Sequence, residues 1–523
     1  MTQGGNNNRA MNLSFRRHFG VRSRLMDTQS VKSYALPILL LAVLAGVVFW
    51  PSERDPSLIL SEAQERPEVL LPEAPIAKRY RHVRLDPVAI DSVRAGGQVV
   101  ELQLFPGETV RVQLDPSEQT GHRSTEVHGT LEGVPGSMVS MVTFDDAVAA
   151  TVQYPDGRMY LVNYAGGGEH SIVELDGDAM HTSHDLQKHF EAQPLIQSPD
   201  GAVTMTPQLQ FGVTNRVNGF PQFTHVLTRT NPWPTQVLLG PVNYGPPIVS
   251  IMVLYTPEAK KQCAGLLGIE SRIRLCIAQV NAAFRRSLVT AKLVLAHAGE
   301  VKYNTAGNLF LDLRNVTFGL TPDLLEVHKL RQAHRADLVS LFVAASPDVF
   351  HGTSWMLNRM FPAPDYGFNV VEAVYAPTSV FAHEIGHNLG CNHATNDIGG
   401  YLNGAMTNSH GWRFTTTVRG NTYPMRTIMA YGAGPRLGYY SNPNVTIWGS
   451  PAGNAASAFN ANTISNTAPM VGSYLTEIIH VQKLGPNAVA DQAVLPGTTN
   501  RPGVRQPRRN IRLNFGPGRF SND

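Results

Sequence analysis

At 523 residues the chain is too long for one compact core, and roughly two or three domains are expected. Hydrophobic residues make up 42% of it and charged residues 16%, a balance that argues against disorder throughout. The net charge is only +3 and its excess lies mainly in the two termini, so the composition excludes a basic face and predicts no nucleic-acid binding.

The N-terminal end of the chain has the charge pattern of an export segment. Residues 1–33 are polar and basic, which predicts that they stay on the cytoplasmic side of a membrane. Residues 34–50 form an uncharged, mostly apolar run, short for a spanning helix. The basic flank favours a signal peptide or a signal-anchor over a buried core helix. Cleavage near Val43 to Ala45 would secrete the chain and retention would anchor it, and both place the rest outside the cytoplasm.

Three segments separate this export segment from the C-terminal half. Residues 51–97 are rich in proline and acids and predict a stalk or linker. Residues 98–193 show the apolar and polar alternation of strands, broken by turn signals, and predict a small β-rich domain. Its place suggests a propeptide or folding-assistance role, with an independent binding module as the alternative. Residues 194–247 predict a second linker, with candidate processing sites near Arg216 and Arg229.

From Ile248 the pattern changes to alternating strands and helices. Buried strands are predicted at 248–255, 291–296 and 336–344, with helices across 269–284 and at 323–334. This order predicts an α/β layer with a mostly parallel sheet over 248–475. Cys263 and Cys276 could form a disulfide, but three cysteines in total decide little.

The segment F-A-H-E-I-G-H-N-L-G-C-N-H follows, and it carries the pattern HExxHxxGxxH. His383 and His387 lie about one turn apart on a helix and can hold one cation, while Glu384 stands beside it as a general base. Gly390 can take the left-handed backbone that ends a helix, which lets His393 reach the same cation.

Three neutral imidazoles with one open position are typical of a catalytic zinc site. The sequence therefore predicts one catalytic Zn²⁺, and a structural Ca²⁺ is left open. Thr378 and Ser379 are suitable residues to cap the start of this helix. Cys391 lies inside the pattern, but His393 already completes the ligand set, so thiolate ligation is not expected. Residues 476–523 end in an arginine-rich tail that predicts disorder.

Together these segments resemble the metzincin zinc endopeptidases, and within them the bacterial peptidyl-Asp metalloendopeptidase and reprolysin-like group. The resemblance covers about 247–475 and implies a zincin-like fold, α+β or α/β, with the active-site helix against a mixed, mostly parallel sheet. It rests on V-L-Y-T-P-E-A at 253–259, V-H-K-L-R-Q-A-H-R-A-D-L-V at 327–339, F-A-H-E-I-G-H-N-L-G at 381–390, R-T-I-M-A-Y-G at 426–432 and Y-S-N-P-N-V at 440–445.

The resemblance also implies roles for residues outside the histidine pattern. Met429 matches the methionine that forms an apolar floor beneath the zinc. Tyr431 matches a tyrosine whose phenol can approach the zinc and stabilise an oxyanion. Many relatives carry an acidic residue directly after the third histidine, whereas this chain has Ala394, with Asp397 a few residues later. The departure puts support of the methionine turn in question.

The leading hypothesis is an exported endopeptidase in which zinc activates a water molecule and Glu384 takes its proton. Its partners would be protein or peptide substrates, and a preference for aspartate is implied only by the resemblance. A catalytically silent surface binding or adhesion protein is the alternative from another class. A third possibility is an inactive precursor whose zinc site is covered by residues 51–247 until cleavage.

Overall fold

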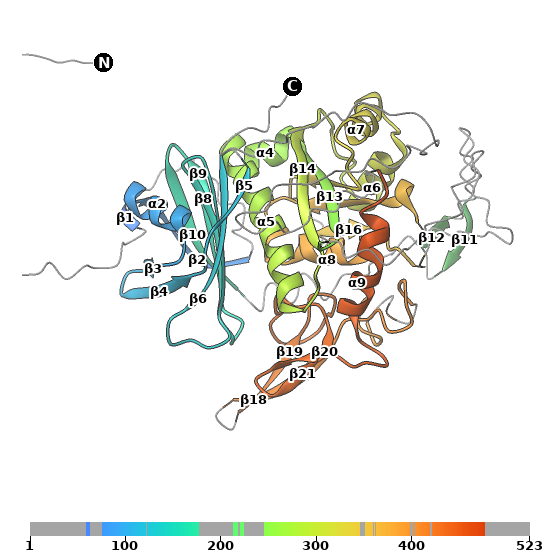
Figure 1. Cartoon of the computed structure of the whole chain (residues 1–523). Helices are drawn as coiled ribbons and strands as arrows, with labels where there is room; N and C mark the ends of the chain where they lie inside the picture. The colour runs from blue at the N-terminus through green and yellow to red at the C-terminus, as the bar shows by residue number, and fades with distance from the viewer. Residues whose placement is uncertain are drawn as a thin grey trace, which may run out of the picture. The chain divides into compact units, whose positions relative to one another are not determined.

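The computed structural model describes residues 59–62, 76–121, 123–176, 213–217, 220–223, 245–345, 351–358, 360, 362–397, 400, 403–418 and 421–475. Figure 1 shows these segments with the labels used below. The predicted export segments 1–33 and 34–50 and the tail 476–523 lie outside them. Among the helices of the described ranges, none is long and apolar enough to cross a membrane.

The N-terminal part forms a ten-stranded antiparallel sheet in the order β1-β2-β10-β9-β8-β7-β6-β4-β3, with β5 paired to β6. Its core packs on helix α2 (Pro87–Ala95), where the Asp86 side chain caps the Val88 amide. The strands are β1 (Ile59–Glu62), β2 (Ala77–Leu85), β3 (Val99–Phe105), β4 (Glu108–Leu114), β5 (Glu118–Gly121), β6 (Ser124–Leu131), β7 (Met138–Phe144), β8 (Ala147–Gln153), β9 (Met159–Gly166) and β10 (Glu169–Leu175).

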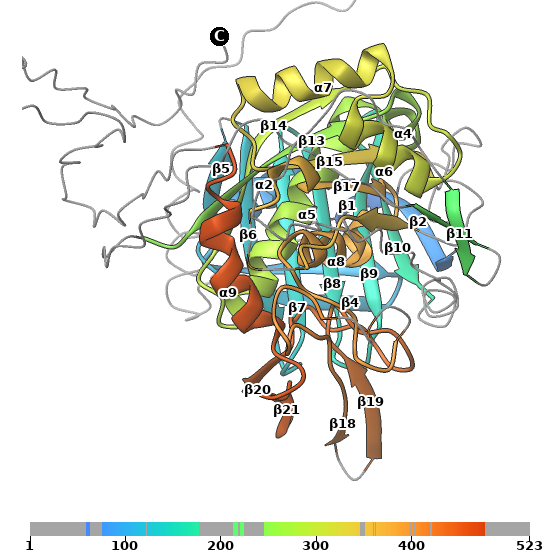
Figure 2. The same ribbon diagram turned by 90° about the vertical axis from the view of Figure 1, so that its right-hand side faces the viewer.

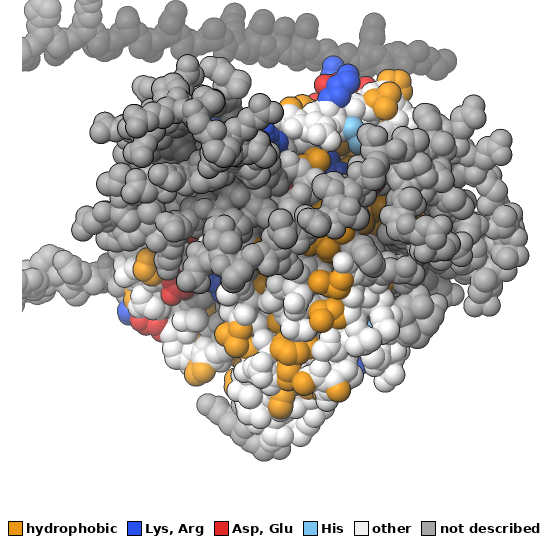
Figure 3. Space-filling view, turned by 45° about the vertical axis from the view of Figure 1, so that its right-hand side comes forward, with side chains coloured by type: hydrophobic (Ala, Val, Ile, Leu, Met, Phe, Trp, Pro, Cys, Tyr) orange, Lys and Arg blue, Asp and Glu red, His pale blue; other side chains and the backbone are white. Residues whose placement is uncertain are grey.

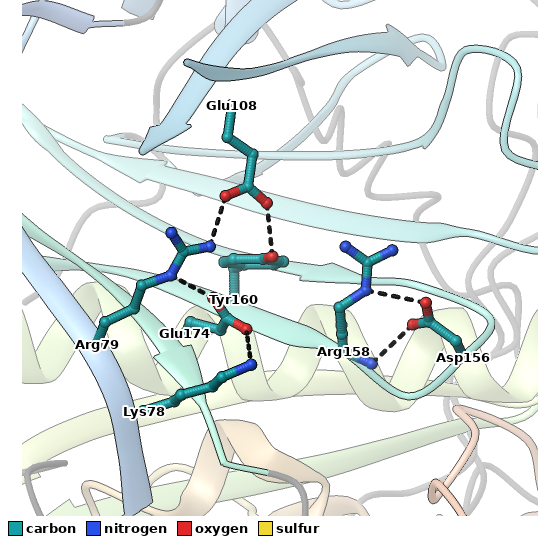
Figure 4. A network of polar contacts seen from close by, with 7 residues as sticks. All are labelled: Lys78, Arg79, Glu108, Asp156, Arg158, Tyr160 and Glu174. Carbon is teal, nitrogen blue, oxygen red and sulfur yellow. Dashed lines mark hydrogen bonds and ion pairs between the residues drawn. The ribbon is translucent and has the colours of Figure 1, made fainter. Parts of the chain in front are cut away.

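The sheet begins within the segment predicted as a stalk, which corrects the expected 51–97 linker. Strand β2 pairs with β10 along its length, and α2 covers the adjoining core. The basic residues of β2 are paired within the sheet. Lys78 and Arg79 both form ion pairs with Glu174 of β10, at 3.1 and 2.5 Å. Arg79 also reaches Glu108, which accepts from Tyr160 at 2.8 Å (Figure 4). The basic residues therefore form cross-strand ion pairs.

A second sheet, of five strands, begins at Ile248. Its order is β14-β13-β15-β17-β16, parallel except for β16, which pairs antiparallel with β17. The fold of this region is thus mixed α/β, as predicted. The strands are β13 (Ile248–Tyr255), β14 (Lys292–Glu300), β15 (Leu338–Val343), β16 (Gly352–Ser354) and β17 (Phe368–Glu372), and the short hairpin β11 (Val213–Val217) with β12 (Phe220–Phe223) precedes them.

Helix α5 (Leu266–Arg286) is buried along most of its length because it has sheets on two sides. Ile269, Ile273 and Phe284 join the core of the second sheet. Leu275 and Ala278 pack with side chains of β7 and β8 from the first sheet. Three shorter helices accompany the second sheet: α4 (Pro257–Gln262), α6 (Leu309–Phe318) and α7 (Pro322–Ala333). Of these, α7 was predicted and α4 and α6 were not, although Asn308 caps the start of α6 and Gly319 ends it in the left-handed conformation.

The chain then enters helix α8 (Val380–Asn388), which packs against β16 and β17 and lies below β17 in Figure 2. Beyond it come the hairpins β18 (Arg413–Val418) with β19 (Asn421–Arg426) and β20 (Asn442–Ile447) with β21 (Ser450–Ala452), and helix α9 (Asn460–Val471). The hairpins share a small core that includes Met425 and Ile447. Hydrophobic side chains of this C-terminal part also reach the surface (Figure 3). All three cysteines are buried, and the structure forms no disulfide between Cys263 and Cys276.

Candidate metal centre

Helix α8 begins at the predicted place, but not with the predicted cap. Ser379 has a left-handed backbone with φ of 73°, and within the described helix its side chain caps no amide. An N-cap side chain reaches the helix amides from an extended backbone, which Ser379 does not have. Thr378 instead donates its hydroxyl to the Tyr375 carbonyl at 2.7 Å. The turn between β17 and α8 is held by this contact rather than by a capping side chain.

The three predicted histidines converge on one point. The Nε2 atom of His383 lies 3.0 Å from that of His393 and 3.1 Å from that of His387, and the last pair is 3.1 Å apart. All three side chains are at least 98% buried. Among the described residues, this is the group whose spacing could hold a metal ion.

The Nδ1 contacts of His383 and His387 show which nitrogen of each ring carries the proton. His383 Nδ1 lies 3.0 Å from the Ile428 carbonyl, and His387 Nδ1 lies 2.9 Å from the Cys391 carbonyl. A carbonyl only accepts hydrogen bonds, so each Nδ1 carries the proton and each Nε2 presents a lone pair. Burial also lowers the pKa of His387 to about 4, which keeps it neutral.

Lone pairs this close repel one another unless a cation lies between them. Zinc binds imidazole nitrogen at about 2.0–2.1 Å, so three nitrogens roughly 3 Å apart can contact one ion together. The donor set, its protonation and its spacing therefore fit Zn²⁺.

Gly390 makes the turn that brings in His393. Its φ is +87°, and a Cβ there would lie 2.5 Å from the Ala405 side chain. Directly after it, Cys391 directs its thiol toward the Asn460 carbonyl at 3.7 Å, and burial holds the pKa of this thiol well above its usual value. Cys391 thus orients His387 through its backbone carbonyl and takes no place among the clustered metal-binding atoms of the described residues.

Met429 is fully buried beneath the helix that carries the first two histidines. A Cβ placed on Gly386 would overlap its sulfur and would lie 3.1 Å from the Tyr440 ring. Tyr440 cannot easily retreat, because its hydroxyl donates to the Ala382 carbonyl at 2.6 Å. The glycine between His383 and His387 is therefore needed for close packing on the methionine turn.

This packing predicts the outcome of Gly386→Ala. Alanine gains about 1 kcal/mol of helix propensity, but overpacking a filled core costs typically about 1–3 kcal/mol. We expect a lower melting temperature and weaker zinc binding, measured by thermal unfolding and by metal titration. Shortening Met429 to valine in the same chain should recover part of the zinc affinity. A variant as stable and as tightly zinc-binding as the parent would contradict the packing.

Glu384 lies beside the triad, in contact with the edge strand β16. Its Oε2 accepts a hydrogen bond from the Ser354 hydroxyl at 2.8 Å, and a Cβ on Gly352 would lie 2.6 Å from its Oε1. Burial raises its pKa to about 8, against the smaller lowering effects of the Ser354 hydrogen bond and the Arg436 charge. A cation at the triad would lower the Glu384 pKa from this raised value toward neutral pH. The carboxylate is therefore suited to exchange a proton near neutral pH.

Tyr431 directs its hydroxyl into the same cluster. The oxygen lies 3.1 Å from His383 Nε2 and 3.0 Å from His393 Nε2. Its backbone is held on both sides: its amide donates to Asp397 Oδ2 at 2.9 Å, and its carbonyl accepts from Arg413 at 3.0 Å. Arg413 and Asp397 also form an ion pair with each other.

The contacts of Asp397 show how the methionine turn is supported although residue 394 is alanine. The side chain at 394 has no polar group, and the carboxylate three residues later reaches the chain after Met429 instead. Sequence reasoning noted Asp397 without a role and did not find Arg413 or Ser354. No local pattern marks these two, because β16 and β18 bring them to the site through long-range pairing.

Comparison with known proteins gives a consistent result. Residues 246–441 match the sequence profile of the reprolysin-type metallo-peptidase family M12. The peptidyl-Asp metalloendopeptidase of Xanthomonas campestris pv. campestris is 26% identical over 408 residues, which cover 74% of this chain and 85% of that protein. A protein of the same name from Stenotrophomonas maltophilia (strain K279a) is 24% identical over 67% of this chain and 74% of its own length. The one from Pseudomonas aeruginosa is 28% identical over 44% of this chain and 40% of that protein.

Proposed function

Residues 246–441 form a reprolysin-like domain of metallo-peptidase family M12, the chain is a zinc metalloendopeptidase, and we propose that His383, His387 and His393 hold its zinc while Glu384 is the general base. The observation that carries the proposal is the convergence of three histidine Nε2 atoms within 3.1 Å of one another, with a buried carboxylate on the residue next to His383. Bound zinc would lower the pKa of a water molecule and polarise the scissile carbonyl.

The residues of the chain divide the remaining work. Glu384 takes a proton from the attacking water and passes it to the leaving amine, while Ser354 holds its carboxylate in place. The Tyr431 hydroxyl lies close enough to the triad to donate to the oxyanion that develops on the substrate. No covalent enzyme intermediate is needed.

The substrate and the location are proposed from separate observations. The relatives are named for cleavage at aspartate, which supports internal peptide bonds next to an acidic residue as the substrate class. The basic segment 1–33 followed by the apolar run 34–50 supports export, with the peptidase part outside the cytoplasm. The β-rich part before it is proposed to assist folding. A silent binding protein is less well supported, because it has no use for a carboxylate held by Ser354 beside the metal.

Digestion of an unfolded protein tests the proposed function. We expect the purified full-length chain to cut denatured casein at internal bonds, with new termini identified by mass spectrometry. A zinc chelator should stop the reaction and added zinc should restore it. Removal of terminal residues alone, or cleavage indifferent to the chelator, would contradict a zinc endopeptidase.

Asp397→Ala tests how Tyr431 is held. Loss of the carboxylate leaves the Tyr431 amide and Arg413 without this partner, so the tyrosine hydroxyl should lose its position. Outer residues that orient a metal site typically contribute about 10–100-fold, and we expect a fall of that size in kcat with little change in bound zinc. The control is Asp146→Asn, at a side chain 96% exposed in the turn between β7 and β8.

A double mutant separates positioning from general stability. If Asp397 acts through Tyr431, then Asp397→Ala adds little to the loss already caused by Tyr431→Phe. Two losses that simply multiply would show that Asp397 acts elsewhere.

A further inference from the structure

Strand β8 of the first sheet has different partners on its two faces. Val148 lies in the core that the first sheet shares with helix α2. Ala149 points to the opposite face and belongs to a cluster with Leu275 of α5. Thr151 and Gln153 lie on the same face as Ala149, because alternate residues of a strand share a face. Strand β8 therefore presents two polar side chains on the face that packs on α5.

Both polar side chains contact the reprolysin-like domain close to α8 in the sequence. Gln279 of α5 donates to the Thr151 hydroxyl at 3.2 Å and to the Pro377 carbonyl at 2.8 Å, just before α8 begins. Gln153 donates its side-chain amide to the Arg436 carbonyl at 2.7 Å. One strand of the first sheet is thus linked to the chain both before and after the helix that carries His383 and His387.

The segment that Gln153 contacts runs beside the methionine turn. The Arg426 amide donates to the Pro435 carbonyl at 3.2 Å, and the Ile428 amide donates to the Tyr439 carbonyl at 2.8 Å. The Ile428 carbonyl in turn accepts the Nδ1 proton of His383 at 3.0 Å. A shift of this segment would therefore move the carbonyl that orients one of the proposed zinc ligands.

A second contact from the first sheet reaches the same segment. Gly157, in the turn between β8 and β9, has a φ of +95°, and a Cβ there would lie 2.6 Å from the Cβ of Pro435. Carbon atoms that are not bonded do not pack this closely, so the turn lies directly against the segment. Glycine suits this position both by its backbone conformation and by its lack of a side chain.

We propose that Gln153 is a positioning residue for the peptidase site and that the first sheet remains bound to the reprolysin-like domain as a lasting part of the enzyme. The inference rests on the proposed endopeptidase function and gives the first sheet a role after folding is complete. A sheet that only assisted folding could leave without loss of activity, and a sheet that covered the zinc site would have to leave first. Here β8 and the turn after it support the methionine turn, so their loss should lower turnover.

Gln153→Met tests the hydrogen bond, because it removes the donor and keeps a side chain of similar length. The Arg436 carbonyl loses this bond, and we expect kcat to fall about 3–10-fold with little change in KM. Gln119→Met is the matched control, because Gln119 donates to the Gly121 carbonyl at 2.8 Å within the first sheet. The control should leave both kcat and KM unchanged.

Gly157→Ala tests the second contact and is compared with Gly107→Ala. Gly107 has a φ of +77°, and a Cβ there would meet nothing within 4 Å. Both substitutions strain the backbone, but only the one at Gly157 pushes on Pro435. We expect Gly157→Ala to lower kcat and weaken zinc binding, whereas Gly107→Ala should lower the melting temperature alone.

Cutting the chain tests whether the first sheet stays bound. A recognition sequence for a specific protease is inserted within residues 224–244 of the full chain, and the cut protein is passed over a size-exclusion column. We expect the two pieces to elute together and to keep the turnover of the uncut protein. A C-terminal piece that elutes alone with full or higher turnover would overturn the inference.

The remaining outcomes separate this inference from the proposed function. An unchanged kcat in Gln153→Met, or equal effects of the two glycine substitutions on zinc affinity, would also overturn the inference. Melting temperatures identify a variant that does not fold, and the cut protein then decides. If the uncut wild type holds zinc and cleaves no peptide, the proposed function fails instead.

Discussion

Glu384→Gln should abolish hydrolysis while the protein keeps its zinc. Glutamine has the shape of glutamate, so it fits beside Gly352, and its carbonyl oxygen can still accept from Ser354. It cannot take a proton from water. General-base catalysis contributes about 10²–10⁴-fold, and here the same group also returns the proton to the leaving amine, so we expect kcat to fall by about 10³-fold or more.

The measurement is the cleavage rate of a quenched peptide together with zinc content by atomic absorption. Glu326→Gln, at a side chain 56% exposed on α7, serves as the charge-matched control and should leave both values unchanged. Retained activity in Glu384→Gln would show that another group carries the proton. Loss of zinc in the same variant would show that Glu384 belongs to the ligand set, contrary to the position assigned to it.

His393→Ala should remove both the metal and the activity. This histidine comes from the chain after Gly390, not from α8, so the two helical histidines stay in place when it is lost. Two ligands bind zinc much more weakly than three, and the variant should be isolated nearly free of zinc and inactive. Binding at about 1,000 times Kd stabilises a protein by about 4 kcal/mol, so added zinc should raise the melting temperature of wild type but not of this variant.

His334→Ala is the matched control, because that side chain is exposed in the loop after α7. It should show the zinc-dependent rise seen with wild type. A His393→Ala protein that still binds one zinc and still cleaves peptides would contradict the assignment of the third ligand.

The metal-binding residues could be predicted from the sequence, but the residues that contact them from other parts of the chain could not. The histidine spacing and Gly390 are local features, and helical geometry alone indicates that the side chains converge. The contact between Ser354 and Glu384 depends on β16 pairing with β17, and no local pattern indicates such a pairing. The same holds for Arg436, which is close to the active site because its segment pairs with Arg426.

The errors in the fold have physical causes of the same kind. Strand β2 was assigned to a stalk because the segment that contains it is rich in proline and acids, yet the basic residues of the strand pair with acids on neighbouring strands. Helix α6 is apolar on several sides and gave no clear periodic stripe, and α9 carries an internal proline, Pro469, that argues against a helix. Ser379 is a residue type that often caps helices, but it does not have the backbone conformation of a cap. In each case tertiary contacts decided what local preference could not.

The most direct test is to measure zinc stoichiometry and peptide turnover in one preparation of the full-length chain. We expect one zinc per chain, and turnover that rises in proportion to zinc as metal-free protein is titrated. A chain that is fully loaded with zinc and cleaves neither peptides nor an unfolded protein would contradict the account, since the histidine triad would then bind a metal without catalysing hydrolysis.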